Sequence, residues 1–287
     1  MIRPKSKRKT TMQKYPFIID IPADEYHEAA RRGKYLSSHL LADFRSCPRL
    51  YRKKMTGEIE PSDTTAYQLG RALHTLILEG RSRFDEEYII SSGPINPKTK
   101  EPFGKLTKAY KEWAAAQKRP VFSSEEFGWM LKLQQSVALH PIASSLLERG
   151  RAEGTVRVSL HGELCQIRMD WFNPDYGERP VIVDLKTTEN LSFFERDARK
   201  YSYPEQLAFY RDVFREAMGG GFDDGVDVYI IAVEKREPYR CGVWKLTDEL
   251  LDQCSATNRM AMSLLKECRC MNDWPTGYEA MRVMGAE

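Results

Sequence analysis

A carboxylate and a lysine share one face of the strand that the run 181–188 predicts. This run reads Val-Ile-Val-Asp-Leu-Lys-Thr-Thr, and its β-branched residues followed by alternation are typical of a strand. Because side chains alternate along a strand, Asp184 and Lys186 lie on the same face, with Cα atoms roughly 6.6 Å apart. An acid and a lysine on the drier face of a core strand indicate a chemical role.

A second carboxylate comes from the preceding run. Residues 164–172 also alternate in polarity and include Asp170. The segment 173–180 contains two prolines and a glycine and can fold this strand back against the next one. That pairing would bring Asp170 next to Asp184, where two carboxylates repel unless a cation lies between them.

The chemistry that fits these groups is metal-assisted phosphodiester hydrolysis. A hard divalent ion such as Mg²⁺ or Mn²⁺ prefers oxygen ligands, binds phosphate and lowers the pKa of a bound water. Lys186 could deprotonate that water, orient it, or stabilise the charge of the pentavalent phosphate. The alternative is a surface ion pair, either Asp184 with Lys186 or Arg168 with Asp170.

The elements that must position these groups form one α/β domain over residues 15–287. The first half is mostly helical, with expected helices at 35–55 and 66–79. The hydrophobic period changes from 3.6 to 2 after Glu153. The order expected from there is β-β-β-α-β-β-α, with a helix over 203–218.

Residues 91–120 interrupt the helical half with prolines and an excess of lysine. Tyr110 and Trp113 are interleaved with the basic residues, a composition typical of an insertion over a nucleic-acid channel. A solvated loop is the alternative interpretation.

Composition favours a cytoplasmic protein. Of the 287 residues, 41% are hydrophobic, and the net charge is only +3. Residues 1–14 carry six basic side chains and no acid, which predicts a disordered tail that either aids solubility or contacts DNA. The tail lacks the apolar core of a secretory signal, and no run is long enough to span a membrane. Six cysteines without a Cys-x-x-Cys pair favour reduced thiols over an iron–sulfur cluster.

The ordered set of motifs resembles the PD-(D/E)XK nuclease superfamily. It is most similar to the RecE-like exonucleases, meaning the C-terminal nuclease domain of exonuclease VIII, and more distantly to lambda exonuclease. The motifs that carry the resemblance are Gly-x-x-x-His at 70–74, Glu153, Arg-x-Asp at 168–170, Asp-Leu-Lys-Thr-Thr at 184–188 and Tyr-x-x-Gln-x-x-x-Tyr at 203–210. The fold that this implies is a central mixed sheet flanked by helices, with a helical N-terminal half.

The resemblance also implies roles for individual residues. Asp170, Asp184 and His74 would hold the metal, with Glu153 as a further acid, and Lys186 would be the catalytic lysine. Gln206 would organise the site. The expected contacts to DNA or its 5′ phosphate are Ser38, Arg45, Arg168, Thr187, Thr188 and Tyr210.

The implied function is that of a Mg²⁺-dependent exonuclease, with Mn²⁺ able to replace Mg²⁺. It would degrade one strand of duplex DNA from 5′ to 3′ and leave a 3′ single strand for recombination. A RecT-type annealing protein and a ring-shaped homo-oligomer are the expected partners, without a membrane. The alternatives are a structure-specific or end-processing endonuclease on the same fold, and a non-catalytic DNA-binding protein.

Overall fold

The structure, a computed structural model, describes residues 14–60, 64–219 and 225–284. All of the predicted basic tail except Lys14 therefore lies outside the described residues. The α-helices are α1 (Ala23–Arg31), α2 (Ser38–Ser46), α3 (Pro48–Met55), α4 (Thr65–His74), α5 (Gly80–Glu87), α6 (Lys108–Ala115), α7 (Ser124–Leu139), α8 (Pro141–Leu147), α9 (Phe194–Lys200), α10 (Tyr203–Ala217) and α11 (Asp248–Met271). A π-helix (Thr75–Glu79) follows α4, and a 3-10 helix (Leu191–Phe193) precedes α9.

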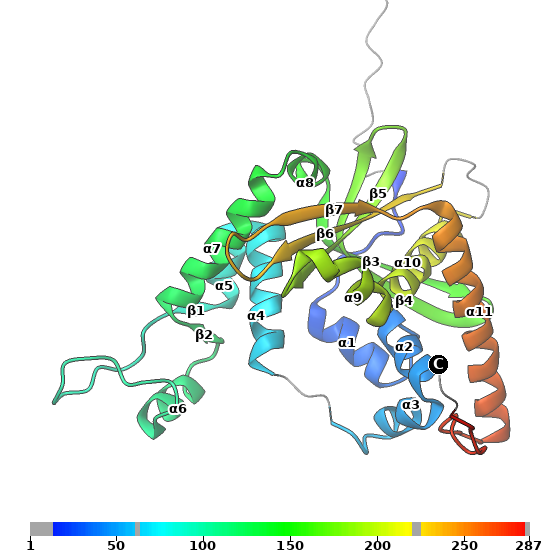
Figure 1. The fold of residues 1–287 in the computed structure, drawn as a ribbon, viewed down its shortest axis with the longest axis horizontal. Coiled ribbons are helices and arrows are strands. Elements are labelled where there is room, and N and C mark those ends of the chain that lie inside the picture. The colour runs from blue at the N-terminus through cyan, green and yellow to red at the C-terminus, as the bar shows by residue number, and fades with distance from the viewer. Residues whose placement is uncertain (1–13, 61–63, 220–224, 285–287) are drawn as a thin grey trace, which may run out of the picture.

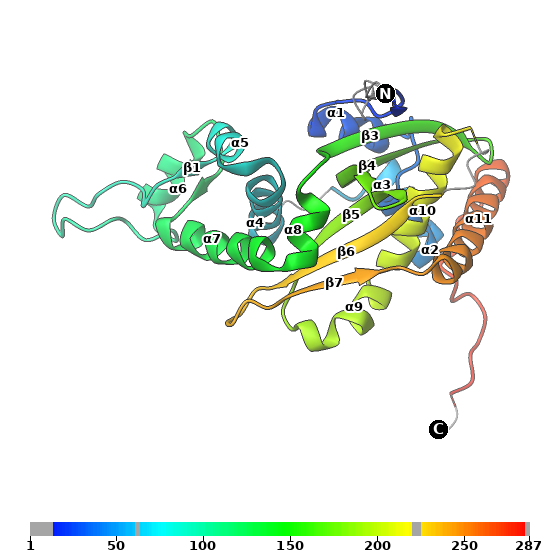
Figure 2. The ribbon, with the colours of Figure 1, turned by 90° about the horizontal axis from the view of Figure 1, so that it is seen from above.

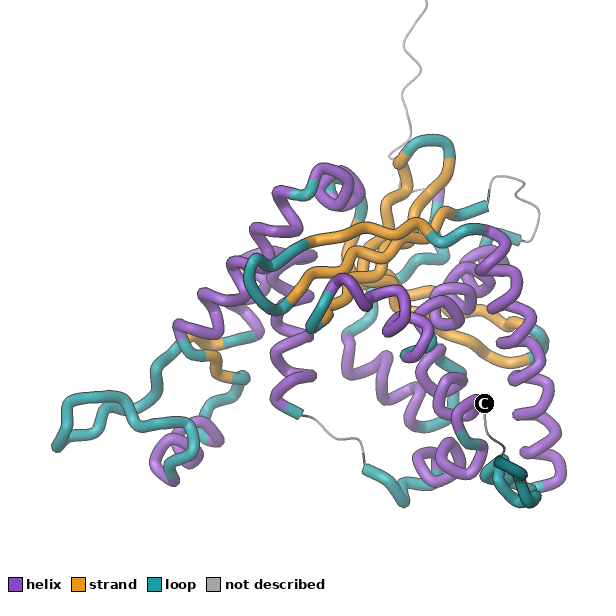
Figure 3. Tube along the Cα trace, in the orientation of Figure 1, coloured by secondary structure: helices purple, strands orange, loops and turns teal. Residues whose placement is uncertain are grey.

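Seven strands complete the described part of the chain. They are β1 (Ile89–Ile90), β2 (Val121–Phe122), β3 (Arg151–Leu160), β4 (Glu163–Tyr176), β5 (Arg179–Thr188), β6 (Asp227–Glu234) and β7 (Cys241–Lys245). Eight α-helices and the π-helix precede the long strands in the described residues, which confirms the helical N-terminal half that the sequence predicts (Figures 1 and 3).

Two of the expected boundaries are wrong. The single helix expected over 35–55 is two helices, because Cys47 is extended (φ −166°, ψ 113°) and Pro48 begins α3. A proline disfavours helical backbone at the residue before it, and this breaks the helix. The long loop expected over 173–180 is a tight turn at Gly177 and Glu178.

The long strands form one mixed sheet in the order β3-β4-β5-β6-β7. The pairs β3–β4, β4–β5 and β6–β7 are antiparallel, whereas β5 and β6 run parallel. The parallel pair requires a crossover, and α9 and α10 make it between β5 and β6. The mixed sheet flanked by helices confirms the predicted fold class.

The sheet is covered on both faces, so its central strand is buried. One face packs with α2, α10 and α11 around a core that includes Ile182 and Leu207. The other face packs with α4, the π-helix, α7 and α8 around a core that includes Val183 and Leu185 (Figure 2). The alternation predicted for the run 181–188 is therefore confirmed. In the described part of the chain, no helix is both long and apolar enough to cross a membrane.

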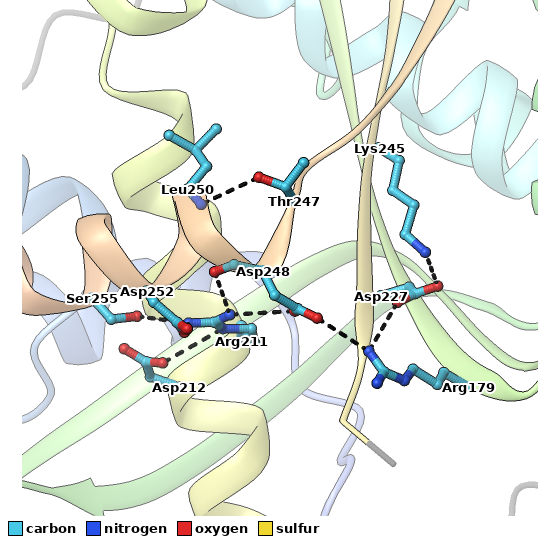
Figure 4. A network of polar contacts seen from close by, with 10 residues as sticks. All are labelled: Arg179, Arg211, Asp212, Asp227, Lys245, Thr247, Asp248, Leu250, Asp252 and Ser255. Carbon is cyan, nitrogen blue, oxygen red and sulfur yellow. Dashed lines mark hydrogen bonds and ion pairs between the residues drawn. The ribbon is translucent and has the colours of Figure 1, made fainter. Parts of the chain in front are cut away.

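A buried arginine fastens α10 to α11. Arg211 in α10 is 1% exposed, and its Nη2 donates to Asp252 Oδ1 at 2.6 Å and to Ser255 Oγ at 3.2 Å (Figure 4). Its Nη1 also donates to the backbone oxygen of Asp248 at 3.5 Å. A buried guanidinium requires partners of this kind, and these contacts fix the helix that reaches the sheet beside Asp184.

Candidate active site

The central strand β5 carries a buried ion pair. Asp184 is 1% exposed, the side chain of Lys186 is 17% exposed, and Nζ of Lys186 lies 2.5 Å from Oδ2 of Asp184. This burial rules out the surface ion pair that the sequence left open. Taking two charges out of water costs desolvation free energy, so at this place the fold tolerates a desolvation penalty.

Asp170 reaches the same place from β4. The pairing of β4 with β5 ends at Trp171 and Val183, and the two strands diverge from there toward Asp170 and Asp184. There the backbone N–H of Leu185 donates to Oδ2 of Asp170 at 2.8 Å. A side-chain carboxylate thus accepts the hydrogen bond of a strand amide, and Asp170 lies beside Asp184 as the sequence predicts.

His74 approaches from the opposite layer. It ends α4 just before the π-helix, a distortion that often accompanies functional sites, and its Nδ1 lies 3.5 Å from Asp170 Oδ2. A Cβ built on Gly70 would meet nothing within 4 Å, so the helix surface one turn earlier faces open space. Burial lowers the pKa of His74, and the Asp170 charge only partly opposes this. The imidazole is therefore neutral, the state in which it can ligate a metal.

Helix α10 closes the site with an amide and two phenols. Nε2 of Gln206 lies 3.4 Å from Asp184 Oδ1 and 3.4 Å from the hydroxyl of Tyr210. The ring of Tyr203 lies 4.9 Å from Nζ of Lys186, in cation–π geometry. Tyr203 belongs to the motif at 203–210, but no role was predicted for it. Gln206 contacts Asp184, and Tyr210 lies buried behind it, so the DNA contact expected of Tyr210 stays a prediction.

The protonation states of the ion pair follow from burial and mutual charge. Burial raises the pKa of Asp184 to about 6, a rise that Lys186 opposes and Asp170 reinforces. Burial lowers the pKa of Lys186, but the two carboxylates raise it by more, so it stays an ammonium. Among the three roles considered for Lys186, this favours orienting water or stabilising charge over accepting a proton.

Glu153 and Arg168 form an ion pair with each other. Nε of Arg168 donates to Oε2 of Glu153, and its Nη1 donates to the backbone oxygen of Ile21 at 2.7 Å. Burial raises the pKa of Glu153 to about 7, the charge of Asp170 adds to the rise, and Arg168 opposes it. Arg168 would have to leave Glu153 before it could contact a phosphate.

The other residues expected to contact DNA are dispersed. Ser38 begins α2, whereas Arg45 in the same helix donates to Asn258 in α11 and does not join the carboxylates. Thr188 is 7% exposed and makes a local turn with Asn190. Thr187 takes the opposite side of β5 from Asp184, because successive side chains alternate. His39 in α2 is a neighbour that the sequence analysis missed: desolvation and then the Lys186 charge lower its pKa.

The donor chemistry fits a hard divalent cation, although the present arrangement does not enclose one. No group of three or more His, Cys, Asp or Glu side chains in the ranges described is arranged to hold a metal ion. The Lys186 ammonium lies beside Asp184, where a bound metal ion would otherwise be expected. Apart from this contact, Oδ2 of Asp184 has no hydrogen-bond partner among the described residues. Two neighbouring carboxylates and a neutral imidazole are nevertheless ligands that such an ion accepts.

This arrangement of a mixed sheet with an acid, an acid and a lysine at its diverging strands defines a PD-(D/E)XK nuclease fold. The family model for the PDDEXK-like domain of unknown function (DUF3799) matches residues 37–284, and the chain belongs to that family. The superfamily assignment made from the motifs is thereby confirmed. Nucleases with this fold generally use divalent metal ions.

A solved structure agrees on the fold. The crystal structure of a candidate exonuclease from Eubacterium rectale superposes with a TM-score of 0.61 at 15% identity, covering 94% of this chain and 96% of that chain. That of SSO0001 aligns with a TM-score of only 0.31 at 12% identity over 77% of this chain and 74% of that chain, which does not indicate a shared fold. Among curated proteins, none matches this sequence significantly.

Proposed function

We propose that this chain is a Mg²⁺-dependent exonuclease that enters at an end of linear duplex DNA and degrades one strand from 5′ to 3′. The observation that carries the proposal is the buried Asp184–Lys186 pair with Asp170 beside it, at the point where β4 and β5 diverge. Charges held dry at such a place are characteristic of catalytic sites. Mn²⁺ would replace Mg²⁺, since both are hard cations that accept oxygen ligands.

Each side chain has a task in hydrolysis. Asp170, Asp184 and His74 would hold the ion, which when bound polarises the phosphate and lowers the pKa of the attacking water. Lys186, an ammonium on the same strand face, donates to phosphoryl oxygens as their negative charge grows. Gln206 holds Oδ1 of Asp184. Lys186 contacts Oδ2, so the ammonium would have to move aside for this oxygen to ligate the ion.

Action at a 5′ end is supported by the start of α2. Ser38 is 4% exposed, and its Oγ has no hydrogen-bond partner among the described residues. The first-turn N–H groups of a helix attract anions, and His39 next in sequence is coupled electrostatically to Lys186. A hydroxyl and first-turn amides at the start of α2 would accept a terminal phosphate.

The product would be a 3′ single strand used in homologous recombination in the cytoplasm. An annealing protein of the RecT type would receive this strand, and a ring-shaped homo-oligomer would keep the enzyme on its DNA. Both partners follow from the resemblance to RecE-like exonucleases and form part of the proposal.

The test compares linear duplexes labelled at the 5′ or the 3′ end with a covalently closed plasmid, all in Mg²⁺. The proposal predicts early release of the 5′ label as mononucleotide, late shortening at the 3′ label, and an intact plasmid. Early loss of the 3′ label would contradict the polarity. Nicking of the plasmid at the same enzyme concentration would favour the endonuclease alternative.

A further inference from the structure

A basic arm, residues 91–120, projects from the side of the molecule formed by α5 and α7. In both views of the ribbon it extends beyond the rest of the structure, with α6 as its only helix (Figures 1 and 2). The arm begins after β1 and ends before β2, and these two short strands pair in parallel at its base. The active site as described uses no residue of this arm.

The charge of the arm exceeds that of the whole protein. Seven basic and two acidic residues give it a net charge of +5, whereas the whole chain carries +3, so everything outside the arm sums to −2. Lys98, Lys100, Lys111 and Lys118 are exposed and form no ion pair with any residue that the structure describes. The chain has 41 acidic residues, so most surface lysines would be expected to lie near an acid. The concentration of unpaired positive charge on the arm therefore indicates an anionic partner.

The arm is held in shape by its own small core. Tyr110 is 7% exposed, its ring centroid lies 5.6 Å from that of Trp113, and a Cβ on Gly93 would come within 2.6 Å of the Tyr110 ring. The backbone N–H of Phe103 donates to the oxygen of Pro94 at 2.9 Å, and that of Asn96 donates to Glu101 at 2.8 Å. The lysines are therefore carried by an ordered element and lose little additional backbone freedom when they bind.

The same core decides what kind of nucleic acid the arm fits. The sequence interpretation that Tyr110 and Trp113 interleave with the lysines for binding is not supported, because these rings pack on each other and on Gly93. Tyr110 is buried and Trp113 is half-buried against it, so the arm does not present a row of open rings on which unpaired bases would stack. Phosphates remain as the target, and duplex DNA presents them most densely, about one charge per 1.7 Å.

We propose that the basic arm binds the phosphate backbone of duplex DNA, away from the bond being cleaved and without reading sequence. The proposal rests on the proposed function in that DNA is taken as the substrate of the neighbouring site. The contacts come from Lys98 and Lys100, which lie in the turn between Asn96 and Glu101, and from Lys111 on α6. Lys118 lies nearer the base of the arm. The arm adds affinity for duplex that recognition of a terminal phosphate alone would lack.

The test is equilibrium binding of a 5′-labelled duplex of about 40 base pairs in EDTA, across a series of salt concentrations. One variant changes Lys98, Lys100, Lys111 and Lys118 to Ser. A matched control changes four exposed cations on other elements, Lys34, Lys132, Lys200 and Arg259, to Ser. A third variant changes the four arm lysines to Arg and keeps the charge.

The arm Ser variant should bind duplex tenfold or more weakly, and its slope of log K against log [salt] should fall by about 3 units, at ~0.9 per lost phosphate contact. The control and the Arg variant should bind like the wild type. Wild-type affinity and slope in the arm Ser variant, or an equal loss in the control, would overturn the proposal. So would an equal loss for a single strand of the same length, since the arm would then not prefer duplex.

This result is independent of the proposed reaction because no hydrolysis occurs in EDTA. Loss of duplex binding in the arm variant would support the arm even if the wild type cleaved no DNA. If that variant bound duplex normally and the wild type cleaved DNA, the proposed role of the arm would be refuted and the proposed function would stand.

Discussion

The Nζ atom of Lys186 lies 2.5 Å from Oδ2 of Asp184, inside a sheet whose both faces are covered by helices. An ion pair in such a place adds little to stability, because desolvation offsets the attraction between the charges. The pair is therefore better explained by chemistry. Two consequences concern Lys186 and Asp184 directly.

Lys186→Met should lower the rate of DNA cleavage by about 10²-fold or more, because it removes the charge that stabilises the transition state. DNA binding should persist, since the ammonium is mostly buried. The control is Lys245→Met, which removes an exposed ion pair with Asp227 at 2.6 Å and should cleave normally. Near-normal cleavage by the Lys186 variant would exclude it from the reaction.

Cleavage should fall as the pH drops through about 6, because burial raises the pKa of Asp184 to about 6. A raised pKa means that this acid takes up its proton at higher pH than an ordinary aspartate, and the protonated form cannot hold a cation. Protons and metal compete for the carboxylate, so more Mg²⁺ should move the acidic limb to lower pH. Rate profiles at two Mg²⁺ concentrations measure this. An acidic limb that stays in place at both concentrations would contradict the assignment.

His74→Ala should raise the Mg²⁺ concentration needed for half-maximal cleavage, with a smaller effect on the rate at saturation. The reason is that a neutral imidazole 3.5 Å from Asp170 is placed to share the ion. His161→Asn is the control, because His161 lies in the turn between β3 and β4 with φ 50°, which asparagine tolerates. Identical Mg²⁺ titrations for the His74 variant and the wild type would return this histidine to a structural role.

A stability prediction tests the fold that positions β4. Gly150 has φ +132°, and an added Cβ would lie 2.2 Å from the backbone oxygen of Phe172. Gly150→Ala should therefore lower the free energy of unfolding much more than Gly177→Ala does. At Gly177 φ is +70°, but no atom lies within 4 Å of an added Cβ. Gly177→Ala should cost only about 1–2 kcal/mol. Urea unfolding of both variants gives the comparison, and equal losses would contradict the close approach.

Much of the fold could be predicted from the sequence because polar and apolar residues alternate from Val183 to Lys186, and a slip of one residue would turn Asp184 and Lys186 into the apolar core around Val183 and Leu185. Asp184 and Lys186 consequently had to share a face. The break at Cys47 was missed because an apolar pattern continues across Pro48, and local backbone preference outweighed that pattern.

The site could be predicted only in part. Asp170 followed from strand pairing, but the partners of Arg168 and Arg45 did not, because an arginine side chain can reach several acceptors and only the tertiary structure selects one. His39 carried no pattern at all in the sequence. The effect of the Lys186 charge on its pKa depends on how α2 packs against the sheet, which no local signal encodes.

The most direct measurement of the central claim is digestion of linear duplex DNA by the wild type and by Asp184→Asn, each with Mg²⁺ and with EDTA. Circular dichroism confirms that both are folded. The wild type should cleave DNA with Mg²⁺ and not with EDTA, and the variant should not cleave in either condition. Cleavage by folded Asp184→Asn at the wild-type rate, or wild-type cleavage that persists in EDTA, would contradict it.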